Sequence, residues 1–210
     1  MKKITFLSIL ALCLTALSFT SCNSDSDSFQ YPTQTEAYNM MVKIAGTGFN
    51  SGKIIFPGDS IDKETQWKTD STYTTVTINP RDSSYTISDF PVSKLANYVK
   101  KAELSSLIAK LPNQTIKGKL LAVDKENLGF GTVTDNIKFT NSEGKEVQLA
   151  FYGGYTNYSL AGITQNKKNF VLYLTPGAIY VDKKLQDDAI RTYTSYGYTL
   201  PYIVRVVYSL

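Results

Sequence analysis

The sequence TYTTVTI at residues 72–78, followed by NPRD at 79–82 and SYTI at 84–87, decides the fold class of this chain. The first and last of these segments are rich in β-branched and aromatic residues, which favour strands. The NPRD segment between them carries asparagine, proline and aspartate, which are typical of tight turns. Together the three segments predict a β-hairpin.

Similar patterns predict two further hairpins and two single strands. The hairpins comprise residues 137–140 with 147–152, across a turn at 141–144, and residues 170–174 with 178–181, across a Pro176-Gly177 turn. The single strands are 115–123, which Gly118 weakens, and 202–208, whose apolar residues predict burial on both faces.

One helical region interrupts the strands. Val92, Leu95, Ala96 and Val99 recur at helical spacing and form an apolar stripe. A second short helix is expected over residues 103–111, just before a proline. Strands, one short helical hairpin and more strands predict an α+β domain. Its mostly antiparallel strands would form a sandwich or a partly open barrel.

The N-terminus has the parts of a bacterial export signal. Lys2 and Lys3 precede an apolar run at residues 4–17, which is too short to cross a bilayer core of about 30 Å. The segment Phe19-Thr20-Ser21-Cys22 resembles a lipobox, with Phe19 in place of the usual leucine. The resemblance implies that residues 1–21 are removed and that Cys22 carries diacylglycerol and acyl chains such as palmitate. The alternative is an ordinary cleaved signal with an incidental cysteine.

The residues after Cys22 predict a tether. Residues 23–28, NSDSDS, are polar and acidic and cannot bury a core, so residues 22–35 are expected to be a lipidated, disordered linker. A single α+β domain is then expected over residues 36–210. The NSDSDS segment resembles the export signal of Bacteroidetes surface lipoproteins, and Asp89-Phe90-Pro91-Val92 resembles a feature of uncharacterised Bacteroidetes lipoprotein families. These resemblances imply an outer-membrane lipid anchor and exposure at the cell surface, and they carry no mechanism.

The composition excludes several kinds of chemistry. The chain has no histidine, and its two cysteines are Cys13, inside the signal, and Cys22. Ser-His-Asp and Cys-His nucleophiles and histidine-based zinc sites are therefore excluded. The 22 basic and 18 acidic residues form no basic cluster with interleaved aromatics. We therefore expect no cofactor, no metal and no nucleic-acid partner.

Fifteen tyrosines supply the strongest candidate for a binding surface, and they concentrate at residues 151–158 and 193–202. An aromatic ring with a hydroxyl can stack on a sugar face and hydrogen-bond to its edge. On a strand, Tyr152 and Tyr158 share a face, whereas Tyr155 joins them only if Gly153-Gly154 forms a bulge. The alternative is that these tyrosines are ordinary, half-buried strand residues.

Carboxylates and serines supply weaker candidates. Asp124 to Asn127, and Asp182 with Asp187-Asp188, could bind Ca²⁺, although a turn explains the first group more simply. Paired carboxylates could also hydrolyse a glycoside. The triplets Asp59-Ser60-Ile61 and Asp70-Ser71-Thr72 resemble the O-glycosylation signal of exported Bacteroidetes proteins. That resemblance implies modified Ser60 and Ser71 in loops, and plain turns are the alternative.

The sequence therefore predicts a lipid-anchored envelope protein that binds without catalysis. Its partners would be the membrane, through the N-terminal lipid, and a glycan or other small ligand or an envelope protein. The alternatives are an Asp/Glu-dependent hydrolase of the envelope and a subunit of a surface complex. A cleft with facing carboxylates of shifted pKa would favour the enzyme, and exposed tyrosine rings would favour binding.

Overall fold

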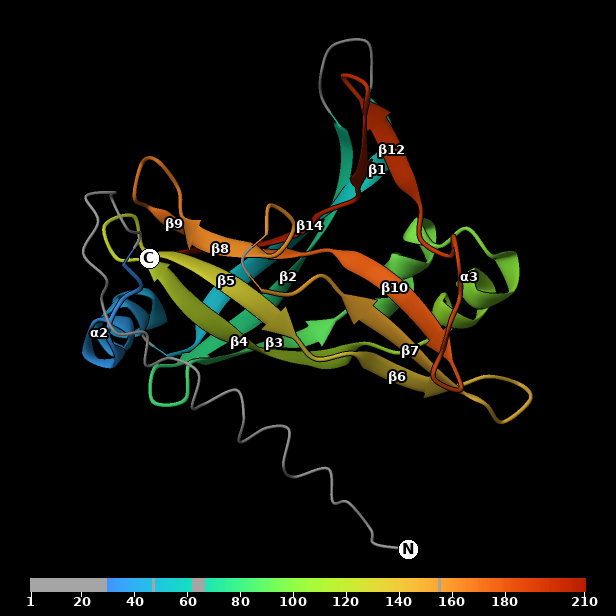
Figure 1. Cartoon of the computed structure of the whole chain (residues 1–210), viewed down its shortest axis with the longest axis horizontal. Helices are drawn as coiled ribbons and strands as arrows, with labels where there is room; N and C mark the ends of the chain where they lie inside the picture. Colours follow the sequence, from blue (N-terminus) through green and yellow to red (C-terminus); the bar gives the residue numbers. More distant parts are fainter. Residues whose placement is uncertain (1–29, 47, 62–66, 155) are drawn as a thin grey trace, which may run out of the picture. The chain divides into compact units, whose positions relative to one another are not determined.

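Eight antiparallel strands close into a barrel in the computed structural model (Figure 1). The structure describes residues 30–46, 48–61, 67–154 and 156–210, so the predicted signal peptide, Cys22 and residues 23–29 of the predicted tether lie outside the described residues. The barrel strands are β1 (Asn50–Ile61), β2 (Trp67–Asn79), β3 (Ser84–Phe90), β4 (Gln114–Asp124), β5 (Gly129–Thr134), β8 (Leu160–Ile163), β9 (Asn169–Leu174) and β14 (Val204–Ser209).

The barrel has an up-and-down topology. Around it the strands follow the order β1-β14-β9-β8-β5-β4-β3-β2, so each barrel strand pairs with the barrel strands before and after it in the chain. Closure comes from β1 and β14, where Gly52 lies opposite Tyr208 and Ile55 opposite Arg205. A closed barrel leaves no unpaired edge in its sheet. The predicted fold class, mostly antiparallel β with short helices, is confirmed, and the barrel is closed rather than partly open.

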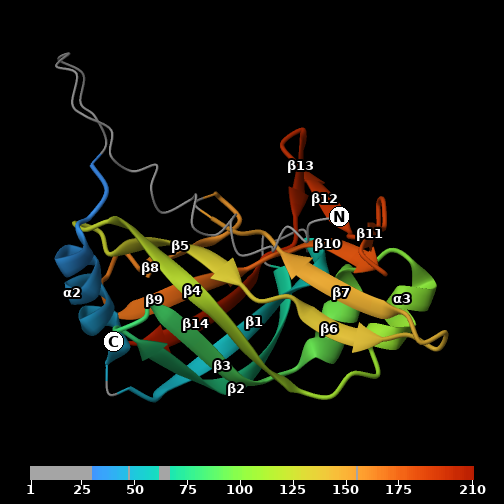
Figure 2. The same ribbon diagram turned by 60° about the horizontal axis from the view of Figure 1, so that its bottom comes forward.

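The connections at the two ends of the barrel differ in length. At one end, residues 80–83, 125–128 and 164–168 are short turns. At the other end, residues 91–113, 135–159 and 175–203 make long connections with their own secondary structure (Figure 2). These insertions contain η1 (Val92–Tyr98), α3 (Ala102–Ile108), β6 (Ile137–Thr140), β7 (Glu146–Phe151), β10 (Pro176–Val181), β11 (Lys184–Leu185), β12 (Thr192–Ser195) and β13 (Tyr198–Pro201). We call this the elaborated end.

The helix α2 (Gln34–Ala45) lies at the short-turn end (Figure 2). It buries Met40, Met41 and Ile44, and the Tyr208 hydroxyl donates a 2.7 Å hydrogen bond to the Ile44 carbonyl. The sequence patterns did not predict this helix, which begins two residues before the expected domain start at residue 36. Within the described part of the chain, no helix combines the length and apolarity that a membrane crossing requires.

Side chains fill the interior of the barrel. Alternate residues of β9 and β14 point inward, and the rings of Phe170 and Tyr208 have centroids 5.3 Å apart. Phe130 from β5 meets Phe170 at 6.0 Å. Eight strands give a barrel just wide enough for such side chains to meet in the middle. Burial of each large apolar side chain contributes about 1.5–3 kcal/mol.

Gly118 allows one tyrosine to cross a neighbouring strand. In the sheet Tyr85 lies opposite Gly118, and Gly118 lies opposite Thr134 on the next strand. A Cβ atom at Gly118 would be 2.4 Å from the Tyr85 hydroxyl and 2.4 Å from the Val133 carbonyl oxygen. The absent side chain therefore leaves room for the Tyr85 hydroxyl to meet the buried Thr134 hydroxyl at 2.6 Å. Burial raises the pKa of Tyr85.

Two insertions pair to form a second sheet, with the order β11-β10-β7-β6. The predicted hairpin at 137–152 is confirmed as β6 and β7, whereas the predicted hairpin of 170–174 with 178–181 is wrong. Strand β9 pairs with β8 and β14 in the barrel, and β10 pairs with β7. Only Thr175 separates β9 from β10, and one residue is too short for a hairpin loop. The chain therefore passes from the barrel to the second sheet at this residue.

Two other predictions need correction. The last strand was expected to be buried on both faces, but Val204, Val206 and Tyr208 face the core while Arg205 is exposed, as a barrel wall requires. The helical pair is present as η1 and α3, although η1 is a 3₁₀-helix and α3 ends at Ile108. A hydrogen bond of 2.8 Å from the Tyr98 hydroxyl to the Pro57 carbonyl fixes η1 against β1.

We predict that Gly118→Ala destabilises the fold by about 1–3 kcal/mol, because the added methyl group collides with Tyr85 and with backbone. Chemical denaturation measures this difference. Gly162→Ala on β8 is the matched control, because its nearest neighbour would be at an ordinary 3.4 Å. Equal stability of the two variants would contradict the proposed role of Gly118.

A second prediction concerns the pH dependence of α2. The Glu36 carboxylate accepts the Thr33 backbone N–H at 2.8 Å and the Lys125 ammonium at 2.9 Å. These bonds, together with the Thr33 hydroxyl, lower the pKa of Glu36 from 4.5 to about 2. Because the folded-state pKa is depressed, its contribution to stability is complete above about pH 4.5 and is lost as the pH falls towards 2.

Titration of the Glu36 carboxyl carbon by NMR tests this expectation. Lys125→Met and Thr33→Val should each raise the midpoint, whereas Lys119→Met, in a remote ion pair with Asp82, should not. A midpoint for Glu36 near that of an ordinary glutamate would disprove the role of its bonds to Thr33 and Lys125 in stabilising α2.

Candidate functional site

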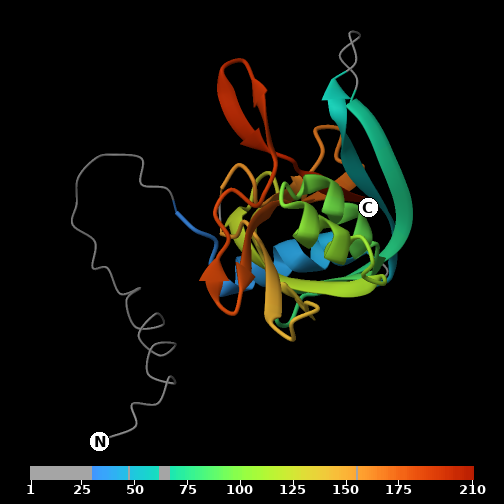
Figure 3. The same cartoon turned by 90° about the vertical axis from the view of Figure 1, so that its right-hand side faces the viewer.

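The elaborated end gathers side chains from three separate insertions onto one rim of the barrel. Figure 3 looks at this end and shows η1 and α3 in front of the strands. A rigid barrel with long loops at one end is a common arrangement for binding sites, because the loops carry the specificity. The hollows at this end include one beside Tyr152 and one beside α3.

The first hollow, which we call the Tyr152 groove, has a volume of about 230 Å³. Its lining comes from the end of β7, the start of β10, the 185–190 segment and the base of the β12–β13 hairpin. The lining residues are Tyr152, Gly177, Ala178, Leu185, Gln186, Asp187, Asp188, Ala189, Ile190, Thr192 and Pro201.

The Tyr152 ring lies against the backbone of β10. A Cβ atom at Gly177 would be 3.1 Å from Cδ2 and 3.3 Å from Cε2 of the ring, so the glycine provides the space for it. The Tyr152 backbone N–H donates to the Thr175 carbonyl at 2.9 Å. The side chain remains 39% exposed, so one part of the ring is supported and another part is open to a ligand.

Tyr158 packs against Tyr152, with ring centroids 5.3 Å apart and a 56° angle between the planes. The sequence pattern predicts both residues on one face of a strand, but β7 ends at Phe151 and the two rings meet outside that strand. The segment around Tyr158 is tied down by a 3.0 Å bond from the Ser159 hydroxyl to the Gly154 carbonyl and a 2.7 Å bond from the Thr175 hydroxyl to the Tyr158 carbonyl. Tyr155 lies outside the described residues.

Polar groups stand beside the ring. Asp188 is held by an ion pair with Lys100, and Gln186 accepts a 3.2 Å hydrogen bond from Lys101. The exposed Asp187 carboxylate has no hydrogen-bond partner among the described residues. A ring face next to carboxylate and amide groups can stack on the apolar face of a sugar and accept hydrogen bonds from its hydroxyls.

The second tyrosine-rich segment is divided between the interior and the solvent. Tyr202 stacks on Tyr98 of η1 at 5.2 Å and contacts Tyr193 at 5.2 Å, which fixes the base of the β12–β13 hairpin. At the tip, Tyr196 is 98% exposed and Tyr198 is 71% exposed. The segment therefore supplies both an anchor and two open rings.

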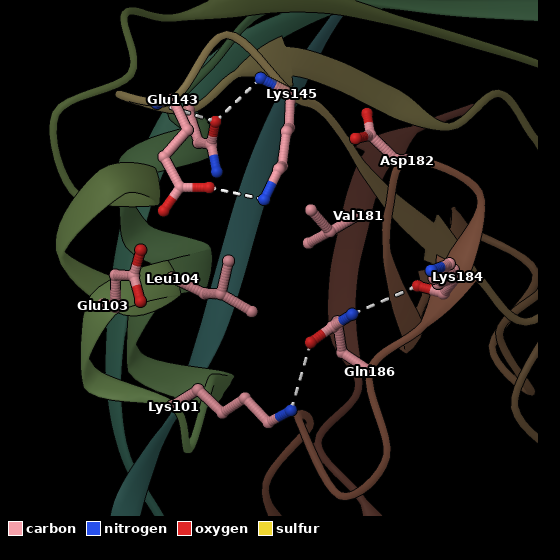
Figure 4. A pocket seen from close by; sticks show the side chains of 10 residues that line it. Lys101, Glu103, Leu104, Glu143, Lys145, Val181, Asp182, Lys184 and Gln186 are labelled. Carbon is pink, nitrogen blue, oxygen red and sulfur yellow. Dashed lines mark hydrogen bonds and ion pairs between the residues drawn. The ribbon is translucent and has the colours of Figure 1, made fainter.

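The second hollow lies between α3, the β6–β7 turn and the β10–β11 hairpin, and we call it the charged cavity (Figure 4). Its volume is about 380 Å³. Its lining residues are Lys101, Glu103, Leu104, Asn141, Glu143, Lys145, Val181, Asp182, Lys184 and Gln186.

Lys145 is the electrostatic centre of the charged cavity. Its ammonium forms a 2.5 Å ion pair with Glu143, and this contact raises the pKa of Lys145 and lowers that of Glu143. Asp182 and Glu103 raise the pKa of Lys145 further. No local pattern indicates that Lys101 and Lys184 share a cavity, because the two belong to insertions far apart in the chain.

The other candidate residues are dispersed. Asp124 forms a turn, as the simpler interpretation predicted, because its carboxylate accepts the backbone N–H groups of Glu126 and Asn127 at 3.0 Å. Ser60 and Ser71 lie on β1 and β2 rather than in loops; Ser71 is exposed, and the side chain of Ser60 is outside the described part. Among the residues that the structure describes, no three His, Cys, Asp or Glu side chains gather to bind a metal ion.

Comparison with known proteins finds one family. The family model described as "Domain of unknown function (DUF4840)" matches residues 25–181, which include Tyr152, Tyr158 and Gly177. The matched region ends with β10, before the β12–β13 hairpin and the closing strand β14. No curated protein and no solved structure matches the chain.

Proposed function

The chain belongs to the DUF4840 family, and we propose that this member is a lipid-anchored envelope protein that binds a glycan in the Tyr152 groove. The observation that carries this proposal is the Tyr152 ring, which lies on Gly177, packs against Tyr158 and stays partly open beside Asp187 and Gln186. A stacking platform that is already in place binds a flat ligand without a large cost in side-chain ordering.

The lipid anchor rests on the N-terminal sequence. The lipobox-like Phe19-Thr20-Ser21-Cys22 and the NSDSDS segment at 23–28 are typical of a Bacteroidetes outer-membrane lipoprotein with its folded domain held outside the bilayer by a tether. Two or three acyl chains on Cys22 anchor a protein durably, since each buried CH₂ contributes about 0.8 kcal/mol. A glycan-binding barrel on such a tether can sample ligands at the cell surface.

The described carboxyl groups whose pKa departs from its ordinary value favour binding over hydrolysis. A glycosidase needs one carboxyl group with a raised pKa to act as the acid. The pKa shifts of Asp70, Asp82, Asp124 and Glu143 are all downward, because each carboxylate accepts hydrogen bonds from nearby donors.

One observation favours a role as a subunit of a surface complex. The Tyr196 and Tyr198 side chains are exposed at the tip of the β12–β13 hairpin.

We predict that Cys22→Ser abolishes incorporation of labelled fatty acid and moves the protein from the detergent phase to the aqueous phase. The sulfur of Cys22 is the atom that the diacylglycerol would alkylate, and a serine hydroxyl does not replace it. Cys13→Ser is the matched control, because Cys13 lies within the predicted signal. Unchanged labelling of the Cys22 variant would refute the lipid anchor.

We predict that the full chain binds at least one neutral glycan on a glycan array and that Tyr152→Ala weakens this binding about tenfold through loss of stacking. Tyr158→Ala and Gly177→Ala should also weaken it, because the first removes the support of the ring and the second displaces the ring. Tyr73→Ala, which removes an exposed ring from the barrel wall, should leave the affinity unchanged.

Thermal unfolding of each variant shows whether it still folds. Binding that survives Tyr152→Ala and Tyr158→Ala would exclude the Tyr152 groove as the site. An array on which the parent protein binds no glycan would exclude the glycan proposal itself.

A further inference from the structure

We propose that the charged cavity is a second binding site, for a short peptide with a free ammonium group at one end and a free carboxylate at the other. The proposal does not depend on the glycan site. The cavity is built from three elements that are distant in sequence, and its volume of about 380 Å³ is in the usual range for small-molecule sites, about 300–1,000 Å³.

The charges of the cavity are balanced in number, and one of the lysines, Lys145, lies among the carboxylates. Three lysines and three carboxylates line it. In Figure 4, Lys101 and Gln186 lie on one side, and Glu143, Lys145 and Asp182 lie on the opposite side. A simple anion would meet the carboxylates, and a simple cation would meet the lysines. A ligand that carries both charges, one at each end, can place each end beside its opposite charge.

The lysine side suits a carboxylate. The Lys101 ammonium donates one 3.2 Å hydrogen bond to the Gln186 side-chain oxygen, which leaves it two further donors. Gln186 is itself fixed by a 3.2 Å bond from its amide nitrogen to the Lys184 carbonyl. A C-terminal carboxylate at this position gains a charge-assisted hydrogen bond from a lysine that is already oriented.

The carboxylate side suits an ammonium group. Lys145 is occupied by Glu143 at 2.5 Å, and one oxygen of Asp182 accepts the Glu146 backbone N–H at 3.1 Å. The second Asp182 oxygen remains available. The carboxylate of Glu103, in the first turn of α3, has no hydrogen-bond partner among the described residues. Glu103, on the α3 side of the cavity, therefore provides an acceptor for the N-terminal ammonium of a peptide, and Asp182 provides a second acceptor across the cavity from it (Figure 4).

Apolar side chains separate the two charged sides. Leu104 from α3 is buried, and Val181 from β10 is half-buried. In Figure 4 the two side chains lie between the lysine and carboxylate groups. They provide an apolar floor for an aliphatic side chain of the peptide, and this contact favours a peptide over a small zwitterion without such a side chain.

Isothermal titration calorimetry of the full chain with the dipeptide alanyl-leucine tests the proposal at low salt, where exposed charges are least screened. The free dipeptide should bind, and the doubly capped N-acetyl-alanyl-leucinamide should bind at least tenfold more weakly. Lys101→Met and Glu103→Gln should each weaken binding of the free dipeptide about tenfold. Lys119→Met and Glu126→Gln, which change exposed charges outside the cavity, should not.

Singly capped dipeptides assign the two ends. The N-acetylated dipeptide lacks the ammonium group, so Glu103→Gln should no longer affect its binding. The amidated dipeptide lacks the carboxylate, so Lys101→Met should no longer affect its binding. Equal binding of the free and doubly capped dipeptides would overturn the proposal, and so would wild-type affinity in both cavity variants. Free leucine binding as tightly as the dipeptide would replace the peptide with a single amino acid.

Tyr152→Ala separates this site from the glycan site. That substitution should weaken glycan binding about tenfold and leave dipeptide binding intact. Loss of dipeptide binding in Tyr152→Ala would contradict the independence of the two sites.

Discussion

The pairing of β1 with β14 is the constraint on which the rest of the structure depends. It joins the first and last strands of the barrel and removes the edges that an open sheet would expose. Because the barrel is up-and-down, every second connection falls at the same end, and three of these connections hold the insertions. The β7–β10 pairing then joins two insertions. This topology brings the three insertions together at the elaborated end, with Tyr152, Gln186 and α3 on the same rim of the barrel.

Local sequence signals predicted the local structure well. The hairpins at 72–87 and 137–152 are present, because β-branched strand residues and turn residues such as asparagine act over a few positions. The hairpin at 170–181 was wrong because the partner of each strand lies elsewhere in the chain, and no short-range pattern encodes that choice. Gly118 was interpreted as a residue that weakens its strand. The structure shows that its missing side chain makes room for Tyr85 of β3, which crosses β4 to reach Thr134 on β5.

The candidate sites were harder to predict from the sequence than the strands and turns were. The ring pair of Tyr152 and Tyr158 was suggested by composition, but the expected geometry, a shared strand face, was not the one that forms. Gly177 was interpreted as part of a hairpin turn, because its role beside Tyr152 depends on a ring that reaches it from another insertion. The charged cavity was missed for the same reason. Lys101, Lys145 and Lys184 are ordinary surface lysines in sequence, and only the pairing of the insertions brings them together.

The closure of the barrel also bears on how the chain folds. Gly52 of β1 pairs with Tyr208 of β14, so the contact that closes the barrel joins residues near opposite ends of the described chain. Such long-range pairing is slow, because the entropy of closing the loop is lost before the contact forms. When the chain is delivered with its N-terminus first, β1 remains an open edge until β14 arrives. The long, exposed β1–β2 ribbon is then the segment most in need of protection from aggregation.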